Sequence, residues 1–549
     1  MATTGARSSA IMAAGTLVSR ILGFVKTLLI TVAIGLSVVT DVFELSNQLP
    51  NLIYVLVAGG VFNAVLVPQI IKASTREDGG ADYISRLLSL AVIGLLLITV
   101  TVILLAYPII SLMGRSWSEA QVDLGVTFAL WCFPQIFFYG LYTVVGQILN
   151  AKEAFGWYMW TPVLNNLIAI ASLLVFITLF GRQSVAHHSL ETWTSAQTFW
   201  LAGTATVGVA CQALVLFLPL WRLHLGLKLK LGWRGIGLGR AAHLSGWILT
   251  TGIIANLSFL FLTWVASIAT GFREQHPEIA ATVPGIASLN YSVLLYQLPH
   301  GVIGLSIATV LFNRMARSAE AEDRESLIIS LSQGLRITSV ATIFCAVALI
   351  VFAGPLGVMF SGGNPVTGIT VGQVLTILAL GGPFLTMSFM MGRMFYAHED
   401  ARTPFINQTL SAGIMVALGL AVAQLSPRYI VFAVAGLYVL QNILATFLYH
   451  RALRRWLGDY DVARIVKTHL RVTLAALLAS VGGVAVLIMM GGSDPQGFMW
   501  TSALHSFITA LAGGSLMGLC YLAALKLFQV RELDGVLGMI RARLGRSRR

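Results

Sequence analysis

Long apolar runs separated by short polar connections dominate this chain. Stretches such as Leu88–Leu105, Leu167–Leu179 and Val340–Ala353 carry no charge, and runs of roughly 18–25 apolar residues match the core of a bilayer. The pattern predicts an all-α polytopic membrane protein with about fourteen transmembrane helices and no soluble domain between them. We place these helices at residues 9–35, 41–72, 85–112, 122–150, 156–181, 197–222, 242–271, 284–315, 325–353, 370–397, 404–425, 427–450, 469–491 and 499–527.

Composition supports this fold class. Of the 549 residues, 57% are hydrophobic and only 10% are charged, whereas a soluble globular chain is about 25% charged. So few charges cannot cover a water-facing surface, which excludes an ordinary soluble enzyme. Arg20 and Lys26 interrupt the first apolar stretch, which continues to Leu36, so we predict an uncleaved first helix rather than a signal peptide.

The basic residues of the connections predict the orientation. If the N-terminus, the even-numbered connections and the C-terminal tail share one side, that side carries 28 Lys and Arg residues. The other side carries four, which are Arg115, Arg182, Arg273 and Arg428. Because Lys and Arg accumulate on the cytoplasmic side, we predict an even number of spans with both termini in the cytoplasm.

The two halves of the chain resemble each other. Gln48-Leu49-Pro50-Asn51 recurs as Gln297-Leu298-Pro299-His300, and Gly146–Glu153 parallels Gly392–Glu399. The offset of about 245–250 residues corresponds to six helices, an even number, so the repeat is parallel. Parallel repeats of this kind build transporters with a cavity between two lobes.

The repeat predicts the domain organisation, with two pseudo-symmetric six-helix lobes and two C-terminal helices that fall outside it. The predicted parts are an N-terminal lobe at 1–222, a cytoplasmic linker at 223–241, a C-terminal lobe at 242–450, helices 13 and 14 at 451–529, and a basic cytoplasmic tail at 530–549.

Few ionisable residues remain at membrane depth, where insertion of each costs roughly 2.5–3.5 kcal/mol and the side chain usually faces a cavity. Arg20 and Lys26 are the main candidates for binding an anion in such a cavity, although both could snorkel to the headgroups instead. Arg336 is a third cationic candidate, with a structural ion pair as the alternative. The full set predicted to bind substrate is Arg20, Lys26, Asn51, Gln297, His300 and Arg336.

Polar residues spaced three and four apart form a stripe on the second helix, and a similar stripe lies on the eighth. Their equivalent places in the repeat predict a hydrated cavity between the lobes. The residues assigned to this polar stripe are Asp41, Glu44, Gln48 and Asn290. Asp41 could alternatively be solvated at the outer membrane interface.

Two prolines at equivalent positions predict bends in these same helices, because proline leaves a backbone carbonyl unpaired. Pro50 and Pro299, together with Gly59 and Gly60, are candidate hinges for alternating access. Static kinks would produce the same sequence pattern.

Motifs of enzyme chemistry are missing from the sequence. It has no phosphate-cradling glycine loop, no metal-spaced His/Cys set and no nucleophile elbow. The four cysteines lie singly in apolar runs, and His187 and His188 have no Cys or carboxylate at ligand spacing. We therefore predict that the protein is not an enzyme, needs no metal or cofactor and does not bind nucleic acid.

Several motifs together resemble the MurJ/MviN family of lipid II flippases, within the multidrug/oligosaccharidyl-lipid/polysaccharide exporter superfamily. The resemblance covers nearly the whole chain and agrees with fourteen helices. The motifs that carry it are Ser19-Arg20-Ile21-Leu22-Gly23-Phe24, Thr40-Asp41, Leu49-Pro50-Asn51-Leu52, Phe62, Val67-Pro68, Gln297-Leu298-Pro299, Gly301-Val302, Gly304, Gly334-Leu335-Arg336, Phe395-Tyr396-Ala397, Asp400 and Thr403-Pro404.

The resemblance implies alternating-access movement of the undecaprenyl-pyrophosphate-linked peptidoglycan precursor to the outer leaflet of the bacterial cytoplasmic (inner) membrane. Membrane lipids and cell-wall synthesis proteins would be further partners. The chain departs from the family's usual charged residues at four places. Lys26-Thr27 stands where the family commonly has Arg-Asp, and Tyr54-Val55 stands where it often has an Arg pair. Gly59 stands in place of an acid and Leu294 in place of an Arg. The cationic set is thus reduced to Arg20 and Lys26, with Arg336.

Other functions remain open from the sequence. One is a flippase for another polyprenyl-linked glycan or a drug/cation antiporter of the same superfamily. An antiporter would usually place carboxylates at the cavity floor, whereas the deep charges of the first helix are basic and favour an anionic cargo. Another is a membrane scaffold that recruits cell-wall machinery without transporting anything.

Overall fold

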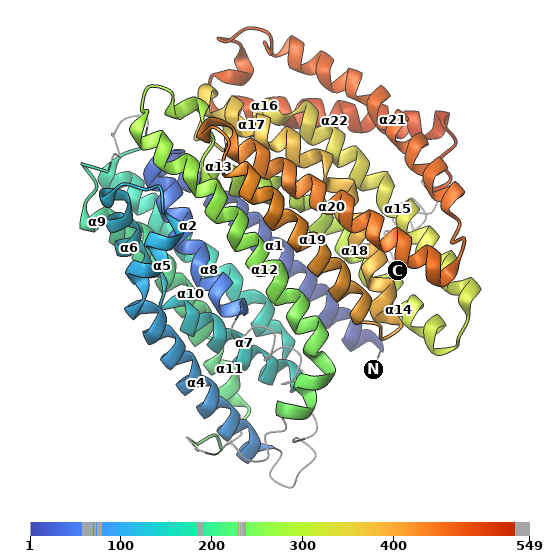
Figure 1. Ribbon diagram of the computed structural model, residues 1–549, viewed down its shortest axis with the longest axis horizontal. Helices are drawn as coiled ribbons and strands as arrows, with labels where there is room; N and C mark the ends of the chain where they lie inside the picture. The colour runs from blue at the N-terminus through green and yellow to red at the C-terminus, as the bar shows by residue number, and fades with distance from the viewer. Residues whose placement is uncertain are drawn as a thin grey trace. The chain divides into compact units, whose positions relative to one another are not determined.

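The computed structural model describes residues 2–56, 70, 73, 80–152, 154–183, 190–224, 226–228, 230, 232 and 238–532. Every regular element in these ranges is a helix (Figure 1). Within the described residues, thirteen helical segments are long and apolar enough to cross a membrane. Each corresponds to one of the fourteen predicted spans. The remaining prediction, 41–72, begins in α2 (Val38–Tyr54) and then runs largely outside the described residues, as do Gly59 and Gly60.

Tertiary contacts divide the chain into two compact units, Met1–His276 and Pro277–Arg549. The first unit contains α1 (Ala2–Ile34), α2, α4 (Ala81–Leu104), α5 (Ala106–Met113), α6 (Glu119–Cys132), α7 (Gln135–Ala151), α8 (Phe155–Phe180), α9 (Ser195–Thr198), η2 (Phe199–Gly203), α10 (Thr204–Leu214), α11 (Phe217–Arg222) and α12 (Leu238–Gln275).

The second unit contains two helices that lie outside the sequence repeat, α21 and α22. Its elements are η3 (Ala280–Thr282), α13 (Ile286–Pro299), η4 (His300–Gly304), α14 (Leu305–Glu320), α15 (Arg324–Val351), α16 (Ala353–Met359), α17 (Pro365–Leu380), α18 (Gly382–Ala397), α19 (Arg402–Val422), α20 (Pro427–Leu457), α21 (Val462–Met489), η5 (Phe498–Trp500) and α22 (Ala503–Leu527). Helices α21 and α22 pack on each other and on α15.

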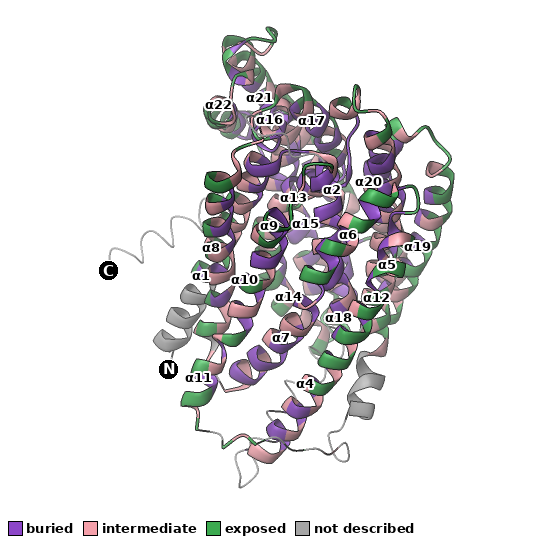
Figure 2. Cartoon of the chain, turned by 90° about the vertical axis from the view of Figure 1, so that its left-hand side faces the viewer, coloured by how far each residue is buried: buried purple, intermediate pink, exposed green. Residues whose placement is uncertain are grey.

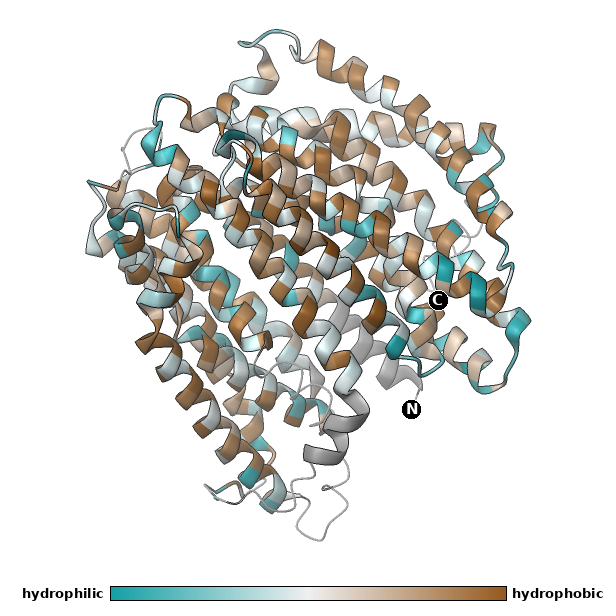
Figure 3. Cartoon of the chain, viewed as in Figure 1, coloured by the Kyte–Doolittle hydropathy of each residue, from teal (hydrophilic) through white to brown (hydrophobic). Residues whose placement is uncertain are grey.

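The long helices bury one face against their neighbours and expose another apolar face. In α4, Ile84 and Leu87 belong to a buried cluster with residues of α7, whereas Leu97 and Leu104 are 64% and 77% exposed. Buried and exposed residues therefore alternate along α4 (Figure 2). Apolar residues also run along the helices, with polar residues mainly toward their ends (Figure 3). Exposed apolar faces of this length are those of a protein solvated by lipid.

Small residues allow the closest helix approach in the second unit. A Cβ added to Gly357 of α16 would collide with the backbone carbonyl oxygen of Gly368 in α17. A Cβ added to Gly372, one turn further along α17, would lie 2.7 Å from the carbonyl oxygen of Ala353. This is the small-residue packing by which membrane helices bring their backbones into contact.

Local geometry agrees with the sequence repeat. Lys152 follows α7 as its C-cap with φ −99° and ψ 15°, and the equivalent His398 follows α18 with φ −99° and ψ 18°. Pro299 is followed directly by the π-helical turn η4. In the equivalent helix, Val55 and Leu56, shortly after Pro50, are also π-helical. Such π-turns interrupt the regular hydrogen-bond ladder and often mark functional positions.

The contact boundary differs from the one predicted by the repeat. Residues 242–275 lie in α12 and cluster with the first unit, although the repeat assigns them to the C-terminal lobe of 242–450. The physical reason is a set of polar contacts that join the end of α12 to α2 and to the start of α6, described below.

Candidate functional site

A small polar cavity lies inside the first unit beside the predicted anion-binding residue Lys26. Its volume is about 60 Å³, and its walls come from α1, α2, α7, α8, η2 and α10. The side chain of Lys26 is half-buried, and the carboxylate of Glu44 on α2 is its attractive electrostatic neighbour. The structure thus brings together one predicted substrate-binding residue and one member of the predicted polar stripe.

Neutral polar side chains from α2 and α7 line the same cavity and are joined by hydrogen bonds. Gln135 donates from Nε2 to Oδ1 of Asn47, at 3.2 Å, and to Oγ1 of Thr206, at 2.9 Å. Tyr139, one turn further along α7, donates its hydroxyl to Oε1 of Gln135 at 3.2 Å. Because Gln135 is held at both ends of its amide, the positions of Asn47 and Tyr139 around the cavity are defined.

Asn165 of α8 completes the polar lining. Its Nδ2 donates to Oε1 of Gln212 in α10 at 3.0 Å. The next residue, Asn166, donates to the backbone oxygen of Ser19 in α1 at 2.8 Å. Since Ser19 precedes Arg20, this bond fixes the segment of α1 that carries the first predicted cation, whose side chain is half-buried.

The predicted stripe on α2 does not share a single environment. Asp41 is fully buried, Glu44 and Gln48 are half-buried, and Asn51 is exposed. The Oε1 of Gln48 is buried and has no hydrogen-bond partner among the described residues. A group of this kind is costly to leave unpaired, and it marks this face of α2 as a place where a polar ligand or water is expected.

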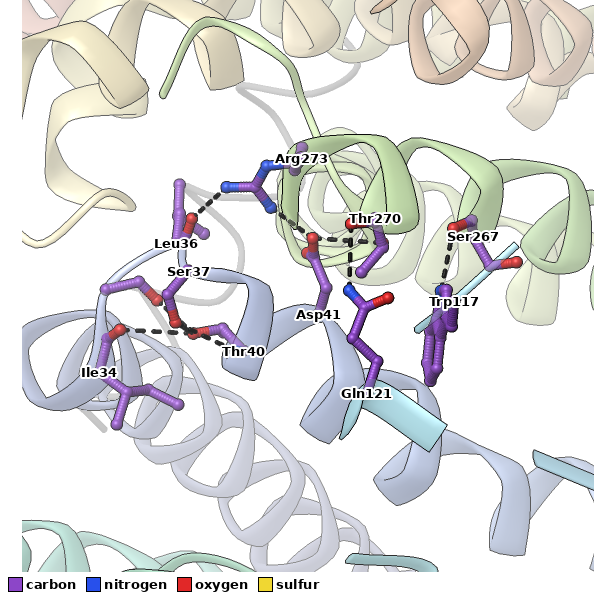
Figure 4. A network of polar contacts seen from close by, with 11 residues as sticks. Ile34, Leu36, Ser37, Thr40, Asp41, Trp117, Gln121, Ser267, Thr270 and Arg273 are labelled. Atoms are coloured by element: carbon purple, nitrogen blue, oxygen red, sulfur yellow. Dashed lines mark hydrogen bonds and ion pairs between the residues drawn. The ribbon is translucent and has the colours of Figure 1, made fainter. Parts of the chain in front are cut away.

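Asp41 is held in a buried ion pair with Arg273, near the end of α12 (Figure 4). Their side chains are 1% and 4% exposed. Arg273 also donates from Nη2 to the backbone oxygen of Leu36 at 2.5 Å, and Thr270 donates to Asp41 at 3.3 Å. Asp41 is therefore neither a solvated interfacial residue nor part of an open, hydrated stripe, because packing of α12 on α2 encloses it.

Three more hydrogen bonds join α12 to the segment that leads into α6. Trp117 donates to the backbone oxygen of Ser267 at 3.0 Å, and Gln121 donates to that of Thr270 at 3.2 Å. Ser118 is the N-cap of α6 and donates to Glu274 at 2.9 Å. These bonds and the ion pair explain why α12 clusters with the first unit.

Arg273 was not predicted as the partner of Asp41. A usable signal was present, because Arg273 is one of four basic residues on the side of the membrane that is otherwise poor in them. Asp41, at the start of the second span, and Arg273, at the end of the seventh, are predicted to lie at that same side. An acid and a rare base at the same depth are candidates for pairing.

Arg336 was predicted to bind substrate, and the structure supports the alternative of a structural ion pair. It pairs with Glu532, and the two side chains are 12% and 9% exposed. Its Nε also donates to Oγ of Ser332 at 3.2 Å, and Ser332 donates to Asp461 at 2.6 Å. These contacts tie α15 to the segment after α22 and favour a structural role for the guanidinium.

The remaining predicted residues lie in the second unit on α13 and η4. Gln297 is exposed, and Asn290 and His300 are half-buried. His300 Nδ1 lies 3.1 Å from Oγ1 of Thr386, and its ring meets Phe389 edge-on. Within the described residues, no group of three or more His, Cys, Asp or Glu side chains is arranged to hold a metal ion.

Solved structures share the fold of this chain. “Lipid II flippase MurJ, inward closed conformation” matches with a TM-score of 0.71 at 18% identity, covering 96% of this chain and 100% of that chain. An inward-facing multidrug resistance MATE family transporter of the MOP superfamily matches with a TM-score of 0.62 at 14% identity, covering 80% and 95%. The chain has the helical fold shared by these transporters.

Sequence relatives identify the family within that class. The family described as “Lipid II flippase MurJ” matches residues 30–508. “Probable lipid II flippase MurJ” of Rhizobium meliloti is 27% identical over 487 residues, covering 86% of this chain and 85% of the relative. “Lipid II flippase MurJ” of Burkholderia cenocepacia is 25% identical over 445 residues, covering 77% of each. The chain belongs to the MurJ family, which confirms the resemblance carried by the sequence motifs.

Proposed function

We propose that this chain is a lipid II flippase, which moves the lipid-linked peptidoglycan precursor from the cytoplasmic to the outer leaflet of the bacterial cytoplasmic membrane. The observation that carries the proposal is the match of the MurJ family over residues 30–508, far more than half of the chain. The apolar helices and their exposed faces suit a multi-pass carrier of a lipid. Both termini would lie in the cytoplasm, as the distribution of basic residues indicates.

The first unit contains cationic side chains that could bind the pyrophosphate of such a cargo. Lys26 supplies a cationic donor beside a polar cavity, and Arg20 lies on the same helix. A phosphate oxygen interacts more strongly with an ammonium group in a low-dielectric interior than in water. The cavity of about 60 Å³ holds only a few water-sized groups, so the glycan and polyprenyl parts of the cargo would lie outside it.

The other residues predicted to bind substrate do not all keep that role in this proposal. Asn51, Gln297 and His300 remain candidate contacts for the polar part of the cargo, because they lie exposed or half-buried on α2, α13 and η4. Arg336 and Asp41 are assigned to ion pairs. The π-turns that follow Pro50 and Pro299 are the candidate points at which these helices change shape during alternating access.

Depletion of the protein in its host, followed by an assay of which leaflet holds lipid II, tests the function directly. Accumulation of the precursor in the inner leaflet is expected. If the precursor reaches the outer leaflet at the normal rate in a strain without a second flippase, the proposal is overturned. Normal precursor export with loss of a different polyprenyl-linked glycan would support the related alternative instead.

The site is tested by complementation with Lys26→Met and with the double substitution Arg20→Ala and Lys26→Ala. Loss of a cationic phosphate contact should lower transport by about tenfold or more, on the basis of ~1.5–3 kcal/mol for a charge-assisted hydrogen bond. Arg182→Gln is the matched control, since Arg182 is exposed in the same unit. Full growth of the double variant at normal expression would show that both cations only snorkel.

A further inference from the structure

A second, larger cavity lies in the second unit and is independent of the Lys26 cavity. Its volume is about 480 Å³, and it is formed where the end of α18, the first turns of α19 and the last turns of α20 meet. Its lining includes Phe395, Asn407, Ala452, Arg455 and Trp456. None of these residues belongs to the set assigned above to cargo binding.

Asn407 is an incompletely satisfied amide in the wall of this cavity. The residue is 7% exposed, and its Nδ2 is buried without a hydrogen-bond partner among the described residues. The other amide atom of Asn407, Oδ1, is not both buried and unpaired. Since the two ends of an amide have nearly the same shape, a half-turn about χ2 presents the Nδ2 donor to the cavity. The site therefore has a donor available for an incoming acceptor.

Asn407 differs from Asn165, the residue at the equivalent position of the internal repeat. Asn407 follows Thr403-Pro404 at the same spacing at which Asn165 follows Thr161-Pro162. In the first unit, Asn165 Nδ2 donates to Gln212 at 3.0 Å. In the second unit the corresponding amide has no such acceptor, and a cavity of about 480 Å³ lies beside it. The missing acceptor is one that a ligand can supply.

The lining of the cavity includes one cationic side chain that can contact an anionic ligand. Arg455 lines it and is exposed on the last turn of α20. Asp400 also lines the cavity, but its carboxylate already accepts bonds from the backbone nitrogens of Arg402 and Thr403, at 2.9 and 3.0 Å, and from the Thr403 hydroxyl at 2.6 Å. Three accepted hydrogen bonds at a helix start stabilise that carboxylate in its charged form. The Arg455 guanidinium is the cationic group of the lining with which an anion could pair.

Apolar helix faces continue from this cavity along the membrane-spanning segments. On α19, Ile406 lines the cavity and is 42% exposed, and Leu410 and Ile414 follow at helical spacing, 50% and 42% exposed. On the neighbouring α20, Phe447 and Ile443 are 57% and 40% exposed. A ligand with a polar group in the cavity would thus have apolar surface on both helices along which chains could lie.

We propose that this cavity binds the headgroup of an anionic phospholipid. The Arg455 guanidinium contacts the phosphate, the Asn407 amide donates to a phosphate or ester oxygen, and the acyl chains lie along the exposed residues of α19 and α20. Basic pockets between membrane helices, with an aromatic residue such as Trp456 at the interface, have the composition that recognises such headgroups. The apolar faces favour a lipid over a soluble phosphate.

The test uses the full-length protein in detergent and measures bound lipid by native mass spectrometry. Dioleoylphosphatidylglycerol is titrated against dioleoylphosphatidylcholine, with sn-glycerol 3-phosphate as the soluble competitor. We expect the wild-type protein to prefer the anionic lipid, and Arg455→Gln to weaken that binding by about tenfold, as removal of one charge-assisted hydrogen bond predicts. Asn407→Asp, which keeps the shape but places a carboxylate at the phosphate, should weaken it as much.

Arg454→Gln is the matched control, because Arg454 is equally exposed on the same turn of α20 but does not line the cavity. It should leave lipid binding unchanged, and equal thermal unfolding of all variants would show that each is folded. Wild-type lipid binding by Arg455→Gln and Asn407→Asp, or an equal loss in Arg454→Gln, would overturn the proposal. Displacement of the lipid by millimolar sn-glycerol 3-phosphate would overturn the assignment to a lipid in favour of a soluble phosphate.

Discussion

Replacing Arg273 with methionine removes the guanidinium that neutralises Asp41 and leaves a carboxylate whose side chain is 1% exposed. The substitution also removes the donor to the Leu36 carbonyl, which Arg273 reaches at 2.5 Å. Thr270, at 3.3 Å, remains as a weak neutral donor to Asp41. Removing one partner of a buried pair costs about 3–5 kcal/mol, so Arg273→Met should lower the free energy of unfolding by that amount.

The reciprocal change Asp41→Leu should cost a similar amount, because it removes the carboxylate that neutralises the buried guanidinium. The double variant should be much less destabilised than the sum of the two single variants, since replacing a whole buried pair with apolar residues is often close to neutral. A double-mutant cycle should therefore give a coupling free energy of about 3 kcal/mol.

The cycle is measured as reversible unfolding in mixed micelles titrated with a denaturing detergent and followed by circular dichroism. Arg182→Gln is the control, as an exposed arginine of the same unit that should change stability by less than about 0.5 kcal/mol. Additive single-variant effects, with a coupling below about 0.5 kcal/mol, would refute the reasoning that burial of this pair holds α12 to α2.

Two further predictions concern the second unit. Gly357→Ala should destabilise the α16–α17 pair by about 1–3 kcal/mol, because the new methyl group meets the Gly368 carbonyl. Gly413→Ala is the control, since a Cβ has open space there, and the same unfolding assay should show little change for it. Hydrogen bonds from Ser326 to Asp323 at the start of α15 hold the pKa of that carboxyl below its usual range. The stabilising effect of the ionised carboxyl is thus present above the pKa that Asp323 has in the unfolded chain, and it is lost as the pH falls through the lower pKa of the folded protein. Asp323→Asn should therefore flatten the pH dependence of stability in the acid range. An unchanged pH profile would count against this helix cap.

The helices were largely predictable from sequence because a spanning helix satisfies its backbone hydrogen bonds within itself. The length and hydropathy of each run therefore suffice to place it, and thirteen of the expected spans appear where they were placed. The repeat was also visible in the sequence, and the similar caps at Lys152 and His398 lie at equivalent positions of it. The boundary between the two units could not be predicted from the sequence, since it depends on contacts of α12 with α2 and α6.

The candidate site was only partly predictable. Lys26 and Glu44 stood out because charge is rare in these helices. The neutral residues Gln135, Tyr139 and Asn165, which line the cavity with Lys26, carry no comparable signal. They come from separate helices, and only packing places them around one space.

The sequence by itself determined that this protein is helical and spans the membrane many times, and that it belongs among the lipid II flippases by its motifs. Only the tertiary structure decided the environment of the individual charges. Asp41 and Arg273 are 232 residues apart, and Arg336 and Glu532 are 196 apart. The energy of a charge depends on its solvation and on its nearest opposite charge. Helix packing sets both, so sequence alone could not distinguish an ion pair from a ligand-binding residue.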